Sequence, residues 1–285
     1  MANKKPKKRP RRIKKKTRKK SGLSLRPKII IASLIVIFGI TFHYRNGIRW
    51  WTISQYERWF KHVNEDKPDV NDIRNIEVMS RHREYLFGFD VSHYQEKIDW
   101  HSIDSVYQQF PLDFVFLRAT MGVDGVDKNY RTEWKKAKSR LLVRGAYHFY
   151  RPDENSLLQA QNFIRNVQLE PGDLAPVLDI ETYPTNQSVD SLKIGLQKWL
   201  DTVEKHYNVK PIIYSGEHFY NELLKDDFSD YPLWIANYNF FVENIKDNWT
   251  FWQFTDKGSM PEISSRIDLN IFRGNRYELK KYLVR

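Results

Sequence analysis

The sequence predicts an α/β protein: a modified TIM-like β/α barrel preceded by an N-terminal transmembrane helix. Eight short apolar runs rich in β-formers recur over residues 86–272, which indicates eight strands. Helical patterns fall between the earlier runs, as in parallel β-α units, whereas the last gaps are too short for a helix. An uncharged apolar run, residues 29–42, lies ahead of all of them and predicts the transmembrane helix.

The first segment, residues 1–28, is a strongly basic tail. It holds 15 Lys or Arg and no Asp or Glu, so the overall charge of +12 leaves the other 257 residues with 12 − 15 = −3. A tail of this composition cannot bury a core and is expected to be disordered, with anionic lipid headgroups as a suitable partner. The mildly acidic remainder lacks the basic stripe that a nucleic-acid-binding domain needs, so no nucleic-acid partner is expected.

The second segment, residues 29–44, is predicted to be a transmembrane signal anchor. Its length is near the short end of the range for a spanning helix, and Trp50 and Trp51 follow it as interfacial aromatics would. No small-x-small cleavage site follows the apolar stretch, which predicts an uncleaved anchor. The basic tail then places the N-terminus in the cytoplasm, with a single pass through the cell (inner) membrane and the rest of the chain on its periplasmic or extracellular side.

Residues 45–84 are polar with scattered aromatics and are predicted to be a stalk or linker, partly helical around residues 51–60. The barrel is expected to occupy residues 85–285. Its predicted strands are 86–91, 113–120, 143–150, 175–181, 210–216, 232–238, 249–255 and 267–272.

The gaps between these strands set the architecture. Helical patterns are assigned to the first four gaps, most clearly at residues 130–141, 157–167 and 189–203, and a short helix is expected near 219–224. The last two gaps hold only 10 and 11 residues, fewer than the dozen or more that a helical crossover needs. About five β-α units followed by three loop-connected strands are therefore expected.

Acidic side chains recur at the predicted strand ends. In the triplet Asp179-Ile180-Glu181, the two acids lie on one face of a strand with their roots about 6.6 Å apart. Two acids separated by a distance of this order can act on one glycosidic bond. Asp90 and Asp268 end two further strands. Aromatic and amide side chains that suit a sugar polymer follow other strands: Tyr94, Tyr147, Tyr214, Trp234, Tyr238 and Gln253. His148 is expected to have a structural role.

These strand ends carry motifs that occur in a fixed order. The motifs are GFDVSHYQ (88–95) with IDW (98–100), GAYHFY (145–150), PVLDIE (176–181), PIIYS (211–215), LWIANY (233–238), WQF (252–254) and IDLN (267–270). Together they resemble glycoside hydrolase family 25, the Chalaropsis-type lysozymes or N-acetylmuramidases, over residues 85 to about 275. Arg118 stands where this family commonly has Lys, and Met121 where it often has Glu.

The resemblance implies a fold, an activity and residue roles. The family fold is a modified β/α barrel with irregular final strands, and its activity is cleavage of the β-1,4 bond between N-acetylmuramic acid and N-acetylglucosamine in peptidoglycan. Glu181 would be the general acid and Asp179 would stabilise the transition state or orient the substrate acetamido group, while Asp90 and Asp268 would line the floor. Retaining, inverting and substrate-assisted mechanisms all stay open.

Two other functions compete with a membrane-anchored muramidase. One is a non-catalytic barrel that binds wall saccharide, although all four acids are present. The other is a chitinase-like barrel, which usually carries Asp-x-Asp-x-Glu, whereas this chain has Val177 at the first position. The absence of cysteine excludes disulfides and thiol catalysis, and the scattered histidines predict neither a metal site nor a cofactor.

Overall fold

A computed structural model describes residues 25–60, 69–95, 98–140, 142–239, 245 and 248–285. The predicted basic tail, up to residue 24, lies outside the described residues. The chain divides into two compact units, Met1–Arg45 and Asn46–Arg285, which are described separately below.

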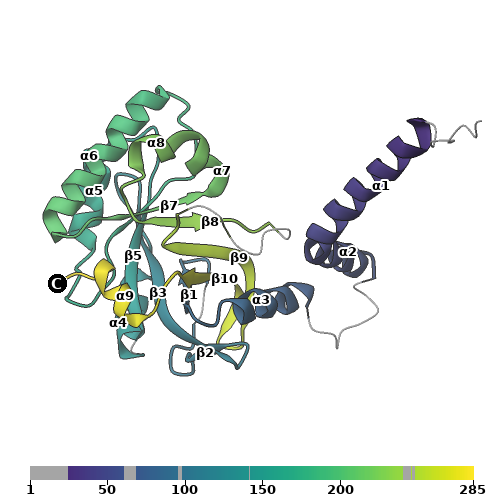
Figure 1. The fold of residues 1–285 in the computed structure, drawn as a ribbon. Coiled ribbons are helices and arrows are strands. Elements are labelled where there is room, and N and C mark those ends of the chain that lie inside the picture. Colours follow the sequence, from purple (N-terminus) through teal and green to yellow (C-terminus); the bar gives the residue numbers. More distant parts are fainter. Residues whose placement is uncertain (1–24, 61–68, 96–97, 141, 240–244, 246–247) are drawn as a thin grey trace, which may run out of the picture. The chain divides into compact units, whose positions relative to one another are not determined.

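The second unit contains a closed barrel of eight strands (Figure 1). The strands follow the order β1-β10-β9-β8-β7-β6-β5-β3, and pairing of β1 with β3 closes the ring. All neighbours are parallel except β10, which is antiparallel to both β1 and β9. The strands are β1 (Leu86–Val91), β3 (Phe110–Met121), β5 (Val143–Phe149), β6 (Val177–Asp179), β7 (Ile212–Gly216), β8 (Leu233–Ala236), β9 (Phe251–Met260) and β10 (Ile263–Phe272). The eight predicted strands are confirmed.

Large aromatic side chains fill the inside of the barrel. Phe114 and Phe116, two residues apart on β3, point to the same face and are fully buried. The strands on either side carry Gly88 and Gly145, where a Cβ atom would lie 2.5 Å or less from these two rings. Glycine at both positions therefore makes room for the rings.

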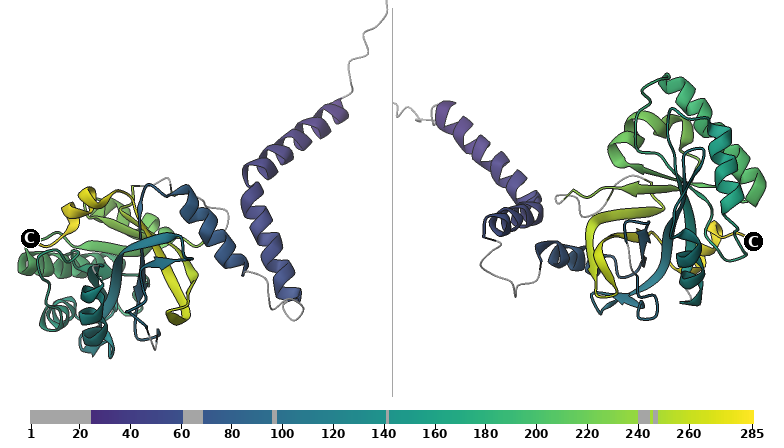
Figure 2. Two further views of the ribbon diagram at one scale, coloured as in Figure 1. Left: turned by 90° about the horizontal axis from the view of Figure 1, so that it is seen from below. Right: turned by 180° about the vertical axis from the view of Figure 1, so that it is seen from behind.

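Helices cover the outside of the barrel after the second, third and fourth predicted strands. They are α4 (Tyr130–Ser139), α5 (Ser156–Asn166) and α6 (Val189–Tyr207), and α5 and α6 lie side by side (Figures 1 and 2). The side chains of Asn155 and Ser188 cap the first turns of α5 and α6. A short helical segment follows β7, comprising α7 (Glu217–Phe219), a π-helical turn (Tyr220–Leu224) and α8 (Lys225–Phe228).

The first connection differs from the prediction. Its described residues hold turns and the short strand β2 (Ser105–Val106), but no helix. Trp100, Ile103 and Val106 from this connection are buried against the barrel, so loop side chains supply the apolar cover that a helix gives elsewhere. The barrel therefore has four helical crossovers instead of five. A further short strand, β4 (Gly125–Val126), forms a hairpin with the end of β3.

The end of the barrel also differs from the prediction. β9 and β10 are longer than expected and meet in a tight hairpin at residues 261–262, instead of being joined by a loop. Because β10 runs antiparallel, Asp268 lies within the strand opposite Asp90 and not at a carboxyl end. The chain then closes the opposite end of the barrel with α9 (Arg276–Leu279) and a 3₁₀ turn (Lys280–Tyr282).

The predicted linker contains two helices, α2 (Arg45–Phe60) and α3 (Val70–Arg81). α3 packs on the barrel: Met79 is fully buried, and Arg74 donates a hydrogen bond to the backbone oxygen of Phe254 at 3.1 Å. Residues from Val70 onward therefore belong to the barrel domain, not to a linker. The sequence did not predict this packing, because Arg74 and Asn75 are polar residues that are buried and satisfied by hydrogen bonds.

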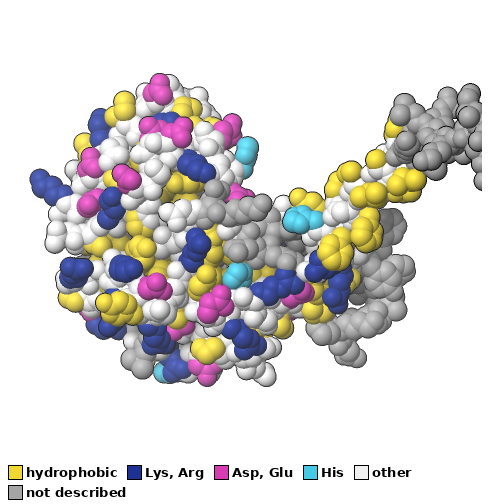
Figure 3. Space-filling view, viewed as in Figure 1, with side chains coloured by type: hydrophobic (Ala, Val, Ile, Leu, Met, Phe, Trp, Pro, Cys, Tyr) yellow, Lys and Arg dark blue, Asp and Glu magenta, His cyan; other side chains and the backbone are white. Residues whose placement is uncertain are grey.

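The first unit contains α1 (Leu25–His43), which is apolar and exposed from Ile29 onward (Figure 3). Within the described part of the chain, no single helix meets the length and hydropathy expected of a membrane span. The two helical segments Ile29–His43 and Arg45–Gln55 reach that length and hydropathy only when they are taken together, as a pair bent by 73°.

Candidate active site

Four carboxyl groups gather at the carboxyl end of the parallel strands. Asp90 comes from β1, Asp179 is the last residue of β6, Glu181 follows two residues later, and Asp268 comes from β10. Asp90 and Asp268 are directly opposed across the β1–β10 pair. The antiparallel direction of β10 is what brings Asp268 to this end of the barrel.

Asp90 is held as a hydrogen-bond acceptor by two amides. Its Oδ2 atom accepts from Gln253 Nε2 at 2.7 Å and from Asn270 Nδ2 at 2.8 Å, and all three residues are buried. A hydrogen bond from an uncharged donor to a carboxylate is stronger than one between neutral groups. The two amides therefore favour the ionised form of Asp90.

The orientation of these amides is fixed from the other side. Trp234 Nε1, which can only donate, bonds to Asn270 Oδ1 at 2.8 Å. Gln253 Oε1 accepts from the hydroxyls of Tyr214, at 2.7 Å, and of Tyr238. With both amide oxygens occupied by donors, both amide nitrogens face Asp90.

All four acids have raised pKa values, chiefly because burial penalises a carboxylate. The pKa of Asp90 is raised to about 7 by burial, against the effect of its two amide donors, and that of Asp268 to about 9 by burial and then by the charge of Asp90. Neighbouring acids also raise the pKa of Asp179 well above its usual range. The group therefore shares protons at neutral pH instead of ionising fully.

Asp179 and Glu181 have different surroundings. Asp179 is buried, and its Oδ1 atom has no hydrogen-bond partner within the described residues. Glu181 as a whole is exposed to solvent, but the surrounding protein partly desolvates its carboxyl group and so raises its pKa. A carboxyl with a raised pKa is suited to proton donation, and an unpartnered acceptor is suited to binding a cation or an N–H group.

Residues 89–263, well over half of the chain, match the family model of glycosyl hydrolases family 25. The chain belongs to glycosyl hydrolase family 25. It is therefore a glycoside hydrolase, and the resemblance found in the strand-end motifs is confirmed.

Relatives and solved structures agree with this membership. The chain is 36% identical to the uncharacterized protein YegX of Escherichia coli K12 over 70% of this chain and 73% of the relative. It is 28% identical to lysozyme M1 of Streptomyces globisporus over 67% of this chain and 69% of the relative. A family 25 glycosyl hydrolase from Bacillus anthracis superposes with a TM-score of 0.63 and 32% identity, covering 70% of this chain and 94% of that one.

The predicted sugar-binding residues fall into two layers. Tyr94 and Tyr238 are exposed and Tyr147 is half-buried. Tyr214, Trp234 and Gln253 are buried. Trp234 in particular stacks on Phe116 inside the barrel, with ring centroids 4.2 Å apart, so it is not a stacking surface for sugar.

Asn270 is a site residue that the sequence-based set left out. It lies two positions after Asp268 on β10, and this i, i+2 spacing places both side chains on one face. The same spacing had singled out Asp179 and Glu181, so the signal was present in the sequence.

His148 is fully buried within the fold, as expected of a structural residue. Thr120 Oγ1 lies 2.7 Å from its Nδ1 atom and Gln159 Oε1 lies 3.1 Å from its Nε2 atom. Burial lowers its pKa to about 4, so it is neutral and not available as an acid or base in the cleft. Among the residues that the structure describes, no group of three or more His, Asp or Glu side chains is arranged to hold a metal ion.

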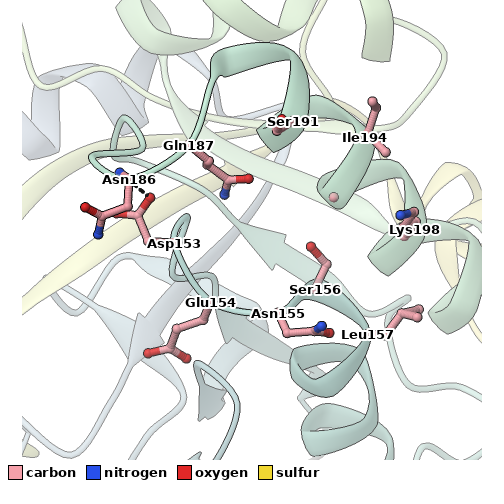
Figure 4. Close-up of a pocket in the computed structure, with 11 residues that line it drawn as sticks. Asp153, Glu154, Asn155, Ser156, Leu157, Asn186, Gln187, Ser191, Ile194 and Lys198 are labelled. Atoms are coloured by element: carbon pink, nitrogen blue, oxygen red, sulfur yellow. Dashed lines mark hydrogen bonds between the residues drawn. The ribbon is translucent and has the colours of Figure 1, made fainter.

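A separate hollow of about 330 Å³ lies between the first turns of α5 and α6 (Figure 4). None of the four cleft acids lines it. Its Asp153 carboxylate accepts hydrogen bonds from Thr185 and from the backbone nitrogen of Asn186, which pins the loop that follows Glu181. This hollow is therefore not part of the acid cluster.

Proposed function

We propose that the protein hydrolyses peptidoglycan, cleaving the β-1,4 bond between N-acetylmuramic acid and N-acetylglucosamine. The observation that carries the proposal is the cluster of four carboxyls with raised pKa values at the carboxyl end of a family 25 barrel. The relative from Streptomyces globisporus, a lysozyme, supports the choice of substrate. Exposed tyrosines beside the cluster provide faces on which pyranose rings can stack.

In this proposal Glu181 is the general acid. Partial burial raises its pKa, which favours the protonated form, and the proton can be transferred to the glycosidic oxygen as the bond to the anomeric carbon breaks. Asp179 lies next to the positive charge that develops on the sugar, and its unpartnered Oδ1 atom can accept a hydrogen bond from the acetamido N–H. Asp90 and Asp268 set the charge of the floor.

The test is Glu181→Gln, which preserves the shape of the side chain but removes its transferable proton. Release of soluble fragments from purified peptidoglycan should fall about 10²–10⁴-fold, the usual contribution of a general acid. Glu204→Gln, the same substitution on α6 away from the cleft, should retain activity. Wild-type products should end in reducing muramic acid. Full activity in Glu181→Gln, or reducing glucosamine ends, would overturn the assignment, and saccharide binding without cleavage by the wild type would favour a binding barrel.

We propose further that the chain is anchored in the cell (inner) membrane, with its N-terminus in the cytoplasm and the barrel on the periplasmic or extracellular side. The exposed apolar side chains of α1 support this, because water does not favour a bare apolar helix. The 15 basic residues of segment 1–28 support the orientation and offer contacts for anionic lipid headgroups.

Protease treatment of intact spheroplasts tests this topology. The barrel should be degraded while an epitope placed at the N-terminus survives, and a chain lacking residues 1–44 should leave the membrane fraction. Protection of the barrel with loss of the N-terminal epitope would show the opposite orientation. Retention of the shortened chain on membranes would show that the anchor lies elsewhere.

A further inference from the structure

A small pocket of about 170 Å³ lies at the end of β3, and its residues have no role assigned so far. The β3–β4 hairpin forms one wall, through Thr120, Met121, Gly125 and Val126. The basic side chains of Arg118 and Lys128, together with His93, line the rest. The pocket is well below the ~300–1,000 Å³ of sites that enclose drug-sized ligands, so it suits a small group on a larger substrate.

The charges around this pocket leave a net positive balance. Asp127 is the acid among its lining residues, and its carboxylate is already engaged. Oδ2 accepts from the backbone nitrogen of His93 at 2.9 Å and from Arg118 Nε at 3.2 Å, and Oδ1 accepts from the backbone nitrogen of Asn129. Arg118 and Lys128 counted against Asp127 give +1 for these three side chains. The charge of the lining residues therefore favours binding of an anion.

Arg118 connects the pocket with the cleft. Its guanidinium is held by Asp127 and lies over the Tyr94 ring, 5.2 Å from the ring centroid. Its backbone pairs with that of Tyr147 on the neighbouring strand, and its charge lowers the pKa of Asp179, against the larger effects that raise it. Arg118 is therefore within electrostatic range of Asp179, so a substituent of a sugar bound over the acids is the substrate group that the pocket would receive.

Among the atoms of Arg118, Nε bonds to Asp127 and Nη2 contacts the His93 ring, whereas no bond from Nη1 occurs within the described residues. A planar guanidinium with a free edge binds carboxylates well, because its donors match the spacing of the two oxygens. Lys128 also lines the pocket and is exposed, so it adds a second cation.

We infer that this pocket, formed by His93, Arg118, Met121 and Lys128, binds a carboxylate on the lactyl arm of N-acetylmuramic acid. The inference rests on the proposed function, because muramic acid is the sugar in peptidoglycan that carries an acid. The carboxylate is that of the lactyl group where the stem peptide has been removed, and that of an acidic stem residue where the peptide is present. The pocket thereby distinguishes muramic acid from N-acetylglucosamine at this position.

Binding measurements on the Glu181→Gln protein test the inference without turnover. Three ligands are titrated by calorimetry: a disaccharide with its stem peptide, the same disaccharide with a free lactyl group, and an N-acetylglucosamine oligomer that has neither. The first two should bind at least about tenfold more tightly than the third, as expected for a charge-assisted contact, and only their affinity should fall as salt is raised. The ratio between the first two identifies the source of the carboxylate.

Single substitutions then place the effect in the pocket. Lys128→Gln should weaken binding of the acidic ligands about two- to fivefold, since it is an exposed charge, and leave the neutral oligomer unchanged. Arg118→Met should remove most of the preference. Lys135→Gln, the same charge change on α4 outside the pocket, is the matched control.

The outcomes separate this inference from the proposed function. Equal affinity for all three ligands, or no change in Lys128→Gln and Arg118→Met, would overturn the pocket while leaving hydrolysis intact. Preferential binding by a wild-type protein that does not cleave peptidoglycan would uphold the pocket and overturn the hydrolase proposal. Failure to bind any of the ligands would overturn both.

Discussion

Replacing Trp234 by Phe should change the protonation of Asp90, although Trp234 is buried in the barrel. The substitution removes the Nε1 donor that holds Asn270 Oδ1 at 2.8 Å, so the Asn270 amide can rotate and stop donating to Asp90. A hydrogen bond to a charged group contributes about 1.5–3 kcal/mol, which corresponds to about one to two pKa units. Losing the bond destabilises the ionised form, so the pKa of Asp90 should rise above its present value of about 7.

The pH profile of kcat/KM on soluble peptidoglycan fragments measures this change. If ionised Asp90 is needed for turnover, the acid limb should move up by about one pH unit in Trp234→Phe. Phe251→Leu is the matched control, because Phe251 is a buried ring of the same cluster that makes no bond to the amides. An unchanged acid limb in Trp234→Phe, or an equal shift in Phe251→Leu, would refute the reasoning, and a carbon-13 titration of the Asp90 carboxyl provides an independent readout.

Two further predictions concern stability. The pKa of Asp268 is raised from 3.8 to about 9, so between these pH values the folded state holds a proton that the unfolded chain has released. The free energy of unfolding should therefore fall as pH rises, with a slope of up to about 1.4 kcal/mol per pH unit. Asp268→Asn should reduce this slope in urea unfolding measured from pH 5 to 9. A steeper slope in that variant would contradict this. Arg144→Met should lower the free energy of unfolding by about 3–5 kcal/mol, because it leaves the buried Asp173 carboxylate, now 2.7 Å from Arg144 Nε, without its partner. The pair Lys193–Asp227, in which both side chains are partly exposed, is the control, and Lys193→Met should change stability by less than about 1 kcal/mol. Equal effects of the two substitutions would show that burial does not govern the difference.

The barrel was predictable from the sequence because its strands are local signals. Each is a short apolar run, and the runs end in polar residues where the strands leave the core, as at Asp90 and Asp179. The short final gaps also predicted that the last third would depart from regular β-α units. The gap length could not show that β9 and β10 form one hairpin, because the residues between the predicted runs continue both strands without being uniformly apolar.

The features that the sequence did not predict correctly depend on contacts between segments that are distant along the chain. α3 has a polar sequence, and its hydrogen bonds to residues about 180 positions away help to join it to the barrel. Trp234 was expected to line the cleft because aromatic residues commonly bind sugar. Its burial depends on the glycines at 88 and 145, which let two phenylalanine rings fill the barrel interior around it, and no local pattern around Trp234 reports that.

The buried network also explains how four acids coexist in one cleft. A tryptophan and tyrosines hold the oxygens of Asn270 and Gln253, so the nitrogens of both amides are committed to Asp90. This selective stabilisation keeps the pKa of Asp90 near 7, whereas that of Asp268, with no comparable set of donors within the described residues, reaches about 9. Asp90 is thus the floor acid that loses its proton first as pH rises. Its negative charge then raises the pKa of its neighbours, which helps the cluster keep a transferable proton near neutral pH. Buried residues such as Trp234 and Asn270 therefore decide which carboxyl is charged when the substrate binds.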